Sequence, residues 1–170
     1  NGGLGIDIIT GGAGADTLTG GENLGGFVKV EARGNGTGSN KLKKIAGGSD
    51  WTGGAYSEQS FIGAGRVSTL AVDTTKHVMI GLSSAANATN SNYQAIEYAL
   101  YQYGNGGLYI YESGEGSGLG RIASYEIGDV LSVERLNDGT VQYLKNNVVF
   151  YTSTQTSPPS TELVADSSLY

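Results

Sequence analysis

Apolar and polar positions in residues 126–153, EIGDVLSVERLNDGTVQYLKNNVVFYTS, form three short segments. Residues 130–136 and 140–145 alternate, residues 148–152 are β-branched and aromatic throughout, and the turn sequences Asn137-Asp138-Gly139 and Asn146-Asn147 separate them. Glycine and asparagine tolerate the positive φ values that tight hairpin turns require. The pattern therefore predicts a three-stranded antiparallel meander. One face of such a meander is apolar and must pack against a second sheet.

Short apolar segments between polar turn clusters continue through most of the chain. They predict further strands over residues 27–32, 41–46, 55–61, 66–71, 77–82, 95–101, 107–111, 121–125 and 163–166. No window keeps an apolar spacing of 3.6 residues between helix caps, so we expect almost no helix. Regularly spaced strands with turns between them are typical of sandwiches. The sequence thus predicts an all-β fold, a two-sheet antiparallel sandwich.

The first residues follow a different pattern, a repeat of nine. Residues 2–10 read GGLGIDIIT, residues 11–19 read GGAGADTLT, and a third unit begins at residue 20. Glycine-rich turns let backbone carbonyls approach a cation, and Asp7 and Asp16 supply the hard oxygen ligands that Ca²⁺ prefers. Ile9 and Leu18 occupy the apolar position of each unit, which points inward in a parallel β-roll. The alternative is a flexible glycine-rich linker.

These two units resemble the calcium-binding nonapeptide repeats of RTX (hemolysin-type) proteins. The resemblance implies calcium as a cofactor and a short N-terminal parallel β-roll over residues 1–22, followed by a sandwich module over residues 23–170. Extracellular modules bind calcium only at roughly 10⁻⁴ to 10⁻³ M, so a roll of this kind folds after export. We therefore expect a secreted, extracellular or cell-surface bacterial protein. The implied metal ligands are Gly3, Gly5, Asp7, Gly12, Gly14 and Asp16.

A second resemblance covers residues 41–170. It rests on the blocks KIAGGSDWTGGAYSEQSF, MIGLS, AIEYALY, YIYESG, GDVLSVERLNDGTVQYLKNNVVFYTS and DSSLY, in that order. They resemble the SPRY-like, concanavalin A-type β-sandwich modules of large bacterial surface and adhesion proteins. The resemblance implies a jelly roll that recognises a ligand, often a glycan. Such modules usually continue past DSSLY into one more strand, which predicts an unpaired sheet edge, unless the N-terminal segment or another chain supplies the missing strand.

Composition excludes several functional classes. The formal net charge is −6 and the isoelectric point is about 4.6, which argues against binding to nucleic acid or to anionic membranes. The chain has no cysteine and one histidine, so a zinc cluster, a disulfide framework and a thiol nucleophile are excluded. No run approaches the roughly 20 apolar residues of a membrane span.

Tyrosines and one tryptophan are the candidate ligand-binding residues, because aromatic rings stack on sugars and tyrosine adds a hydroxyl. Trp51 has an alternative role as a core residue or as a packing anchor between sheets, and about half of the tyrosines should face inward. Glu112, Glu115 and Arg121 flank a glycine-rich loop, where they either bind hydroxyls or are simply solvated. The predicted ligand-binding set is Trp51, Tyr93, Tyr101, Tyr103, Tyr109, Tyr111 and Glu112.

No catalytic residues are predicted. Glycanases on this kind of sandwich place alternating acids on one strand face. The nearest match, Glu126-Ile127-Gly128-Asp129, has its acids three residues apart and a glycine between them, so Asp129 is expected to close a turn instead. We therefore expect a non-enzymatic binding module for an extracellular glycan or surface ligand. The alternatives are a subunit of an extracellular filament or surface layer assembled by strand donation and, less favoured, a glycoside hydrolase.

The calcium hypothesis makes a direct prediction about the repeat segment. Removing calcium with a chelator should raise the protease sensitivity of residues 1–21, because the roll is held together by the ion. Limited proteolysis with and without millimolar calcium measures this. Equal cleavage under both conditions would identify the segment as a linker.

Overall fold

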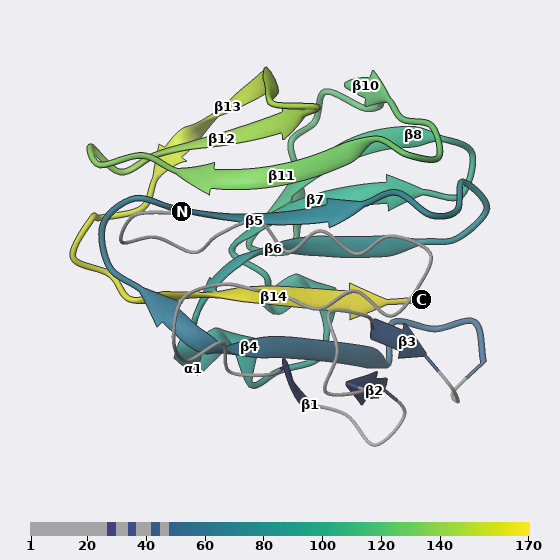
Figure 1. Cartoon of the computed structure of the whole chain (residues 1–170), viewed down its shortest axis with the longest axis horizontal. Helices are drawn as coiled ribbons and strands as arrows, with labels where there is room; N and C mark the ends of the chain where they lie inside the picture. The colour runs from purple at the N-terminus through teal and green to yellow at the C-terminus, as the bar shows by residue number, and fades with distance from the viewer. Residues whose placement is uncertain (1–26, 30–33, 37–41, 45–47) are drawn as a thin grey trace.

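The computed structural model describes residues 27–29, 34–36, 42–44 and 48–170. Its two principal sheets are antiparallel and run across the view of Figure 1. The larger sheet has the order β1-β4-β14-β6-β7-β8-β10, with β9 paired to β8, and comprises β1 (Phe27–Lys29), β4 (Gly53–Phe61), β14 (Leu163–Leu169), β6 (Val78–Ser84), β7 (Tyr98–Tyr103), β8 (Gly107–Glu112), β10 (Ala123–Ser124) and β9 (Glu115–Gly116). The smaller sheet comprises β13 (Val148–Thr156), β12 (Thr140–Lys145), β11 (Val130–Arg135) and β5 (Gly65–Leu70).

Four short elements complete the described structure. Strands β2 (Gly34–Gly36) and β3 (Leu42–Lys44) pair only with each other. The helical content consists of α1 (Ala85–Ala88) and the 3₁₀ turn η1 (Tyr93–Ala95). The all-β sandwich predicted from the sequence is confirmed, as is the near absence of helix in this part of the chain.

The predicted meander is present as β11, β12 and β13. Asn146 and Asn147 both adopt positive φ and form the tight β12–β13 turn. In the β11–β12 turn only Gly139 has positive φ, because this connection is a longer loop in which Leu136 and Thr140 still exchange a backbone hydrogen bond. A side chain at Gly139 would also approach Ser157 O to 2.5 Å, so glycine is required on two counts.

Several strand boundaries differ from the sequence prediction. β7 begins at Tyr98 rather than residue 95, because the Asn92 side chain accepts a hydrogen bond from Gln94 N and starts η1 there. β13 and β14 extend beyond the predicted ends, whereas β10 retains only two residues. The predicted strand over residues 41–46 is described only in part, and the repeat segment and its metal ligands lie outside the described residues.

The core lies between the inward faces of the two sheets. The larger sheet contributes alternate residues of β6, β7 and β8, and the smaller sheet contributes alternate residues of β5, β11 and β12. The side chains that are almost wholly buried there include Val67, Leu82, Leu100, Leu108, Ile110, Leu131, Val133, Val141 and Tyr143. Burial of branched apolar side chains at about 25 cal/mol per Å² is what holds the two sheets together.

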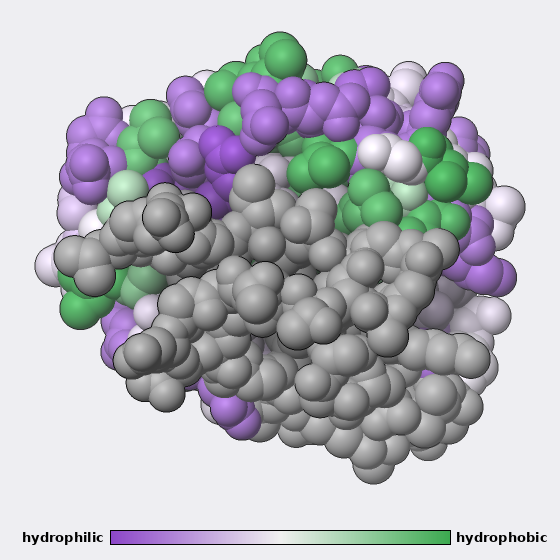
Figure 2. Space-filling model, in the orientation of Figure 1, coloured by the Kyte–Doolittle hydropathy of each residue, from purple (hydrophilic) through white to green (hydrophobic). Residues whose placement is uncertain are grey.

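Strand β14 lies inside the larger sheet, not at its edge. It pairs with β4 on one side and with β6 on the other. The prediction of an unpaired edge at the C-terminal strand is therefore wrong, and strand donation at that edge loses its basis. Where the described residues are visible in Figure 2, hydrophobic residues lie next to hydrophilic ones.

One arginine is completely buried at the end of the core. Arg135 donates from Nε to Gly63 O at 2.7 Å and from Nη1 to Pro158 O and Thr161 O at 3.1 and 2.8 Å. Its guanidinium also lies 5.0 Å from the centre of the Phe61 ring. Burial lowers the pKa of Arg135 from its ordinary value. The arginine therefore ties the loop after β4 to the loop before β14 through their carbonyls.

Replacing Arg135 with methionine should destabilise the fold by about 3 kcal/mol or more, because the carbonyls it binds lose their charged donor. Urea unfolding monitored by fluorescence measures the change. The control is Arg66→Met, whose partly exposed pair with Glu134 (3.0 Å) should cost no more than about 1 kcal/mol. Equal losses in the two variants would contradict the structural role of Arg135.

The connection between β6 and β7 folds back over the outer face of the larger sheet. α1 packs on β6, β14 and β4, and its last residue, Ala88, is fully buried. Gly81 in β6 makes this possible, because a Cβ there would lie 2.0 Å from Tyr98 O and 2.9 Å from Ile96 Cγ2. Ser168 Oγ donates to Ser91 O at 3.0 Å and fastens the middle of the connection to β14.

Asp166 is buried on this outer face, near α1. Its Oδ2 accepts a hydrogen bond from Ser83 Oγ at 2.7 Å, and its Oδ1 accepts one from Ser167 N at 2.7 Å. Burial raises the pKa of Asp166 to about 7, the two hydrogen bonds oppose this rise, and the charge of Glu97 adds to it. The folded protein therefore holds a proton on Asp166 at pH values where the unfolded chain has released it.

This proton makes stability depend on pH. The contribution of Asp166 is full below its unfolded pKa near 3.8 and is lost as pH rises to about 7. The free energy of unfolding should fall over that window by an amount on the order of 3 to 4 kcal/mol. Urea unfolding at pH 4.5 to 8 of the wild type and of Asp166→Asn measures it. The asparagine variant should lose this fall, and an unchanged profile would contradict the buried proton.

Candidate functional site

Aromatic side chains collect on the outer face of the larger sheet, where β7 and β8 lie side by side. Tyr98 and Leu100 of β7 and Leu108 and Ile110 of β8 face the core, so the intervening residues face outward. The outward tyrosines pair closely across the strands. The ring centroids of Tyr101 lie 5.5, 6.0 and 5.6 Å from those of Tyr103, Tyr109 and Tyr111.

Trp51 packs onto this group from the loop before β4. Its ring centroid is 5.4 Å from that of Tyr101 and 5.3 Å from that of Tyr93, which η1 brings to the same face. Trp51 N donates to Asp50 Oδ1 at 2.8 Å, and the Asp50 carbonyl accepts a hydrogen bond from Lys44 Nζ. These bonds hold the loop so that Trp51 lies partly buried on the tyrosines. The alternative role as a packing residue is supported, because Trp51 packs against a buried cluster, but that cluster lies on the outer face of the larger sheet and not between the two sheets.

Two further rings that the sequence did not indicate join the group. His77 precedes β6 and Tyr170 follows β14, so both lie at the sheet end where β7 finishes. His77 Nδ1 and Tyr101 Oη are 2.7 Å apart, within hydrogen-bond distance. The His77 ring meets those of Tyr103 and Tyr170 edge-on at 4.5 and 5.2 Å. Only the antiparallel strand order reveals this meeting, because His77 and Tyr170 are far apart in sequence.

We call this set of rings the aromatic platform. Its members share the outer face of the larger sheet and contact one another edge-on or tilted. They are Trp51, His77, Tyr93, Tyr101, Tyr103, Tyr109, Tyr111 and Tyr170. Each such ring pair adds about 0.5 to 1.5 kcal/mol beyond the burial of its area.

The platform is buried at its centre and open at its rim. Tyr101 is only 9% exposed, and burial raises the pKa of its hydroxyl well above the ordinary value, with neighbouring tyrosines adding to the rise. Tyr103 is 38% exposed and Tyr170 is 45% exposed. Ring faces and neutral hydroxyls are thus available to a ligand that is both apolar and polar, as a sugar ring is.

Six of the seven predicted ligand-binding residues belong to the platform, and the prediction is wrong for Glu112. This residue ends β8 on the opposite face, where it is 7% exposed and its Oε1 accepts a hydrogen bond from Tyr143 Oη at 3.0 Å. Burial, then the charge of Glu112, raises the pKa of Tyr143. The strand period of two places Glu112 inward whenever Tyr111 points outward. Glu115 and Arg121 are exposed, which fits both alternatives that the sequence left open for them.

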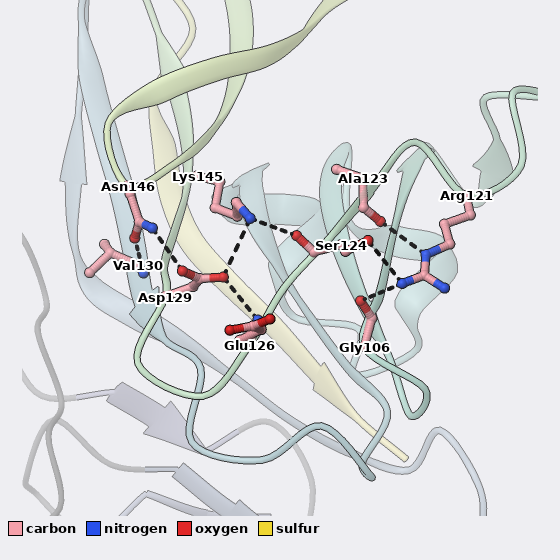
Figure 3. Close-up of polar contacts among 9 residues, drawn as sticks. All are labelled: Gly106, Arg121, Ala123, Ser124, Glu126, Asp129, Val130, Lys145 and Asn146. Carbon is pink, nitrogen blue, oxygen red and sulfur yellow. Dashed lines mark hydrogen bonds and ion pairs between the residues drawn. The ribbon is translucent and has the colours of Figure 1, made fainter.

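Glu126 and Asp129, whose spacing in the sequence argues against a catalytic pair, belong to one turn that the Asp129 side chain stabilises (Figure 3). Asp129 Oδ2 accepts a hydrogen bond from Glu126 N at 2.9 Å, and its Oδ1 accepts one from Asn146 Nδ2 at 2.7 Å. Lys145 Nζ lies 3.6 Å from Asp129 Oδ2. Burial alone would raise the pKa of Asp129, but these hydrogen bonds and the Lys145 charge lower it. A carboxyl group in this state is a poor general acid, so the predicted turn-closing role fits.

No group of three or more acids and histidines suited to a metal is found among the residues that the structure describes. In the same part of the chain, no helix is both long and apolar enough to span a bilayer. The predicted calcium ligands belong to the undescribed N-terminal segment, so the calcium hypothesis still rests on the sequence repeat.

No family model matches the sequence, and no curated relative matches it. Solved structures do match. The SPRY domain of human HERC1 has a TM-score of 0.55 at 16% identity, over 76% of this chain and 79% of that domain. The Bacillus licheniformis β-glucanase has a TM-score of 0.52 at 10% identity, over 87% and 81%. The carbohydrate-binding module CBM66 from Bacillus subtilis has a TM-score of 0.50 at 11% identity, over 86% and 93%.

These structures share a β-sandwich fold with this chain. At such low identity the likeness shows the fold alone, since one sandwich serves both binding modules and enzymes. The structural part of the SPRY-like, concanavalin A-type resemblance is therefore supported, whereas function has to be argued from the site.

Proposed function

We propose that this chain is a non-enzymatic carbohydrate-binding module whose aromatic platform holds a glycan. The observation that carries the proposal is the gathering of eight rings on one face of a rigid sheet, with Tyr103 and Tyr170 exposed at its rim. Sugar rings present apolar C–H faces that stack on aromatic rings, and their hydroxyls bond to polar groups at the edges.

The construction of the platform supports a binding role more than a packing role. A purely structural second core would favour aliphatic or phenylalanine side chains, because each buried hydroxyl needs a partner. This face instead carries six tyrosines, and Tyr93, Tyr109 and Tyr111 are only partly buried. Their rings are supported from below by Met79, Ile96 and Ala99, which are almost wholly buried. Rigid rings on a packed base lose little entropy when a ligand binds.

Calcium-dependent folding of the N-terminal repeats and secretion belong to the same proposal. The two in-register units with Asp7 and Asp16 support them. Secretion, calcium and glycan recognition are mutually consistent with adhesion at a cell surface.

Removing single rings from the rim should weaken glycan binding. Tyr103→Ala and Tyr109→Ala should each reduce affinity by about tenfold, because each variant loses a stacking surface. A glycan array on the monomeric protein identifies a ligand, and isothermal titration calorimetry with that ligand measures the affinity.

The matched control is Tyr56→Ala. Tyr56 lies in β4 and makes none of the ring contacts of the platform within the described part of the chain. Its loss should leave affinity unchanged. An array without any glycan hit, or equal losses in all three variants, would reject the platform as a glycan site.

A further inference from the structure

One charged side chain lies beside the platform in a fixed orientation. Arg121 donates from Nε to Ala123 O at 3.3 Å and from Nη2 to Gly106 O and Ser124 Oγ at 3.1 and 3.0 Å (Figure 3). Its Nη1 makes no hydrogen bond among the described residues, and no carboxylate there forms an ion pair with it. The guanidinium is thus oriented by three neutral acceptors and keeps one nitrogen free.

Gly107 locates this guanidinium relative to the tyrosines. A Cβ on Gly107 would lie 3.0 Å from Tyr109 Cε2, 3.3 Å from Arg121 Nε and 2.9 Å from Asn105 Oδ1. Tyr109, Arg121 and Asn105 therefore close so tightly around Gly107 that a side chain there would collide with them, which places Arg121 directly beside the Tyr109 ring. Gly107 is also paired with Tyr103 across the β7–β8 ladder, so Arg121 and Tyr109 meet next to the open rim of the platform.

A free guanidinium edge beside aromatic rings has a defined chemical preference. Arginine binds carboxylates and related oxyanions through charge-assisted hydrogen bonds, which are stronger than neutral ones. A sugar ring stacked near Tyr103 and Tyr109 would bring a ring substituent next to Arg121. Neutral hydroxyls would satisfy Arg121 less well than an anionic group.

Resting on the proposed function, we infer that the glycan is acidic and that Arg121 binds its anionic group beside Tyr109. The anionic group is a carboxylate or a sulfate on the sugar ring. The negative net charge of the chain does not prevent this, since at physiological salt charges farther away than about 8 Å are largely screened. Arg121 acts here as a specificity residue, and the rings supply the stacking surface.

The test compares matched ligands. An oligogalacturonate and the neutral oligosaccharide obtained by reducing its carboxylates to alcohols differ only in that each carboxylate is replaced by a hydroxymethyl group, and dextran sulfate against dextran makes the sulfate pair. Calorimetry at 150 mM salt should show at least one acidic member binding about tenfold tighter than its neutral partner. Arg121→Gln should remove that preference and leave binding of the neutral partner unchanged.

Two further variants separate contact from general charge and from folding. Lys145→Gln makes the same change in net charge, and its ammonium contacts Ser124 O and Asp129 rather than the platform, so the acidic preference should persist. Arg121→Lys keeps the charge but loses the planar donor edge, so the preference should shrink without disappearing. Thermal melting of each variant verifies that it is folded.

The binding measurements separate the anionic subsite from the glycan-binding platform. Preference for sulfate alone, lost in Arg121→Gln, would support the anionic subsite and assign sulfate to it. Equal binding of acidic and neutral ligands, or a preference that survives Arg121→Gln, would overturn the subsite and leave the glycan-binding platform standing. Absence of binding to every glycan would overturn both.

Discussion

The whole structure depends on face-to-face packing of two antiparallel sheets through strands whose side chains alternate. β7 and β8 show what this constraint achieves, because the same two strands serve both faces of the larger sheet. Leu100, Leu108 and Ile110 complete the core, and the residues between them must point outward. A rigid, well-packed base is thereby placed directly beneath the aromatic platform.

Buried polar groups occur where loops have to be fastened to this sandwich. Arg135 donates hydrogen bonds to carbonyls of two loops at one end of the core. Asp166 lies on the outer face of the larger sheet, near the connection between β6 and β7. Burial disfavours the charged form of each group, so it lowers the pKa of Arg135 and raises the pKa of Asp166. These two groups fix the conformation of the loops. Desolvating them costs free energy, which burial of the apolar core offsets.

In the function proposed above, the platform and Arg121 divide glycan recognition into two tasks. The rings of the platform come from segments that are far apart in the sequence. The sheet beneath them holds them in place, so they provide a stacking surface of fixed shape. Arg121 comes from the loop after β9, and three neutral acceptors set its plane. Loops held by a rigid sheet are a common place for specificity, because they vary without disturbing the core. The β-sandwich shared with the SPRY domain and CBM66 is compatible with such a division but does not require it.

Alternation and turn residues in the sequence were enough to determine the all-β class, the meander from β11 to β13 and the aromatic character of β7 and β8, because strand period and turn chemistry are local. They could not determine that β14 lies inside the larger sheet, or that Glu112 faces Tyr143. Strand order was decided by tertiary packing, and it alone brought Trp51, His77 and Tyr170 to the tyrosines. Non-local pairing leaves no periodic trace in a sequence, since each strand satisfies its own pattern whichever neighbour it has.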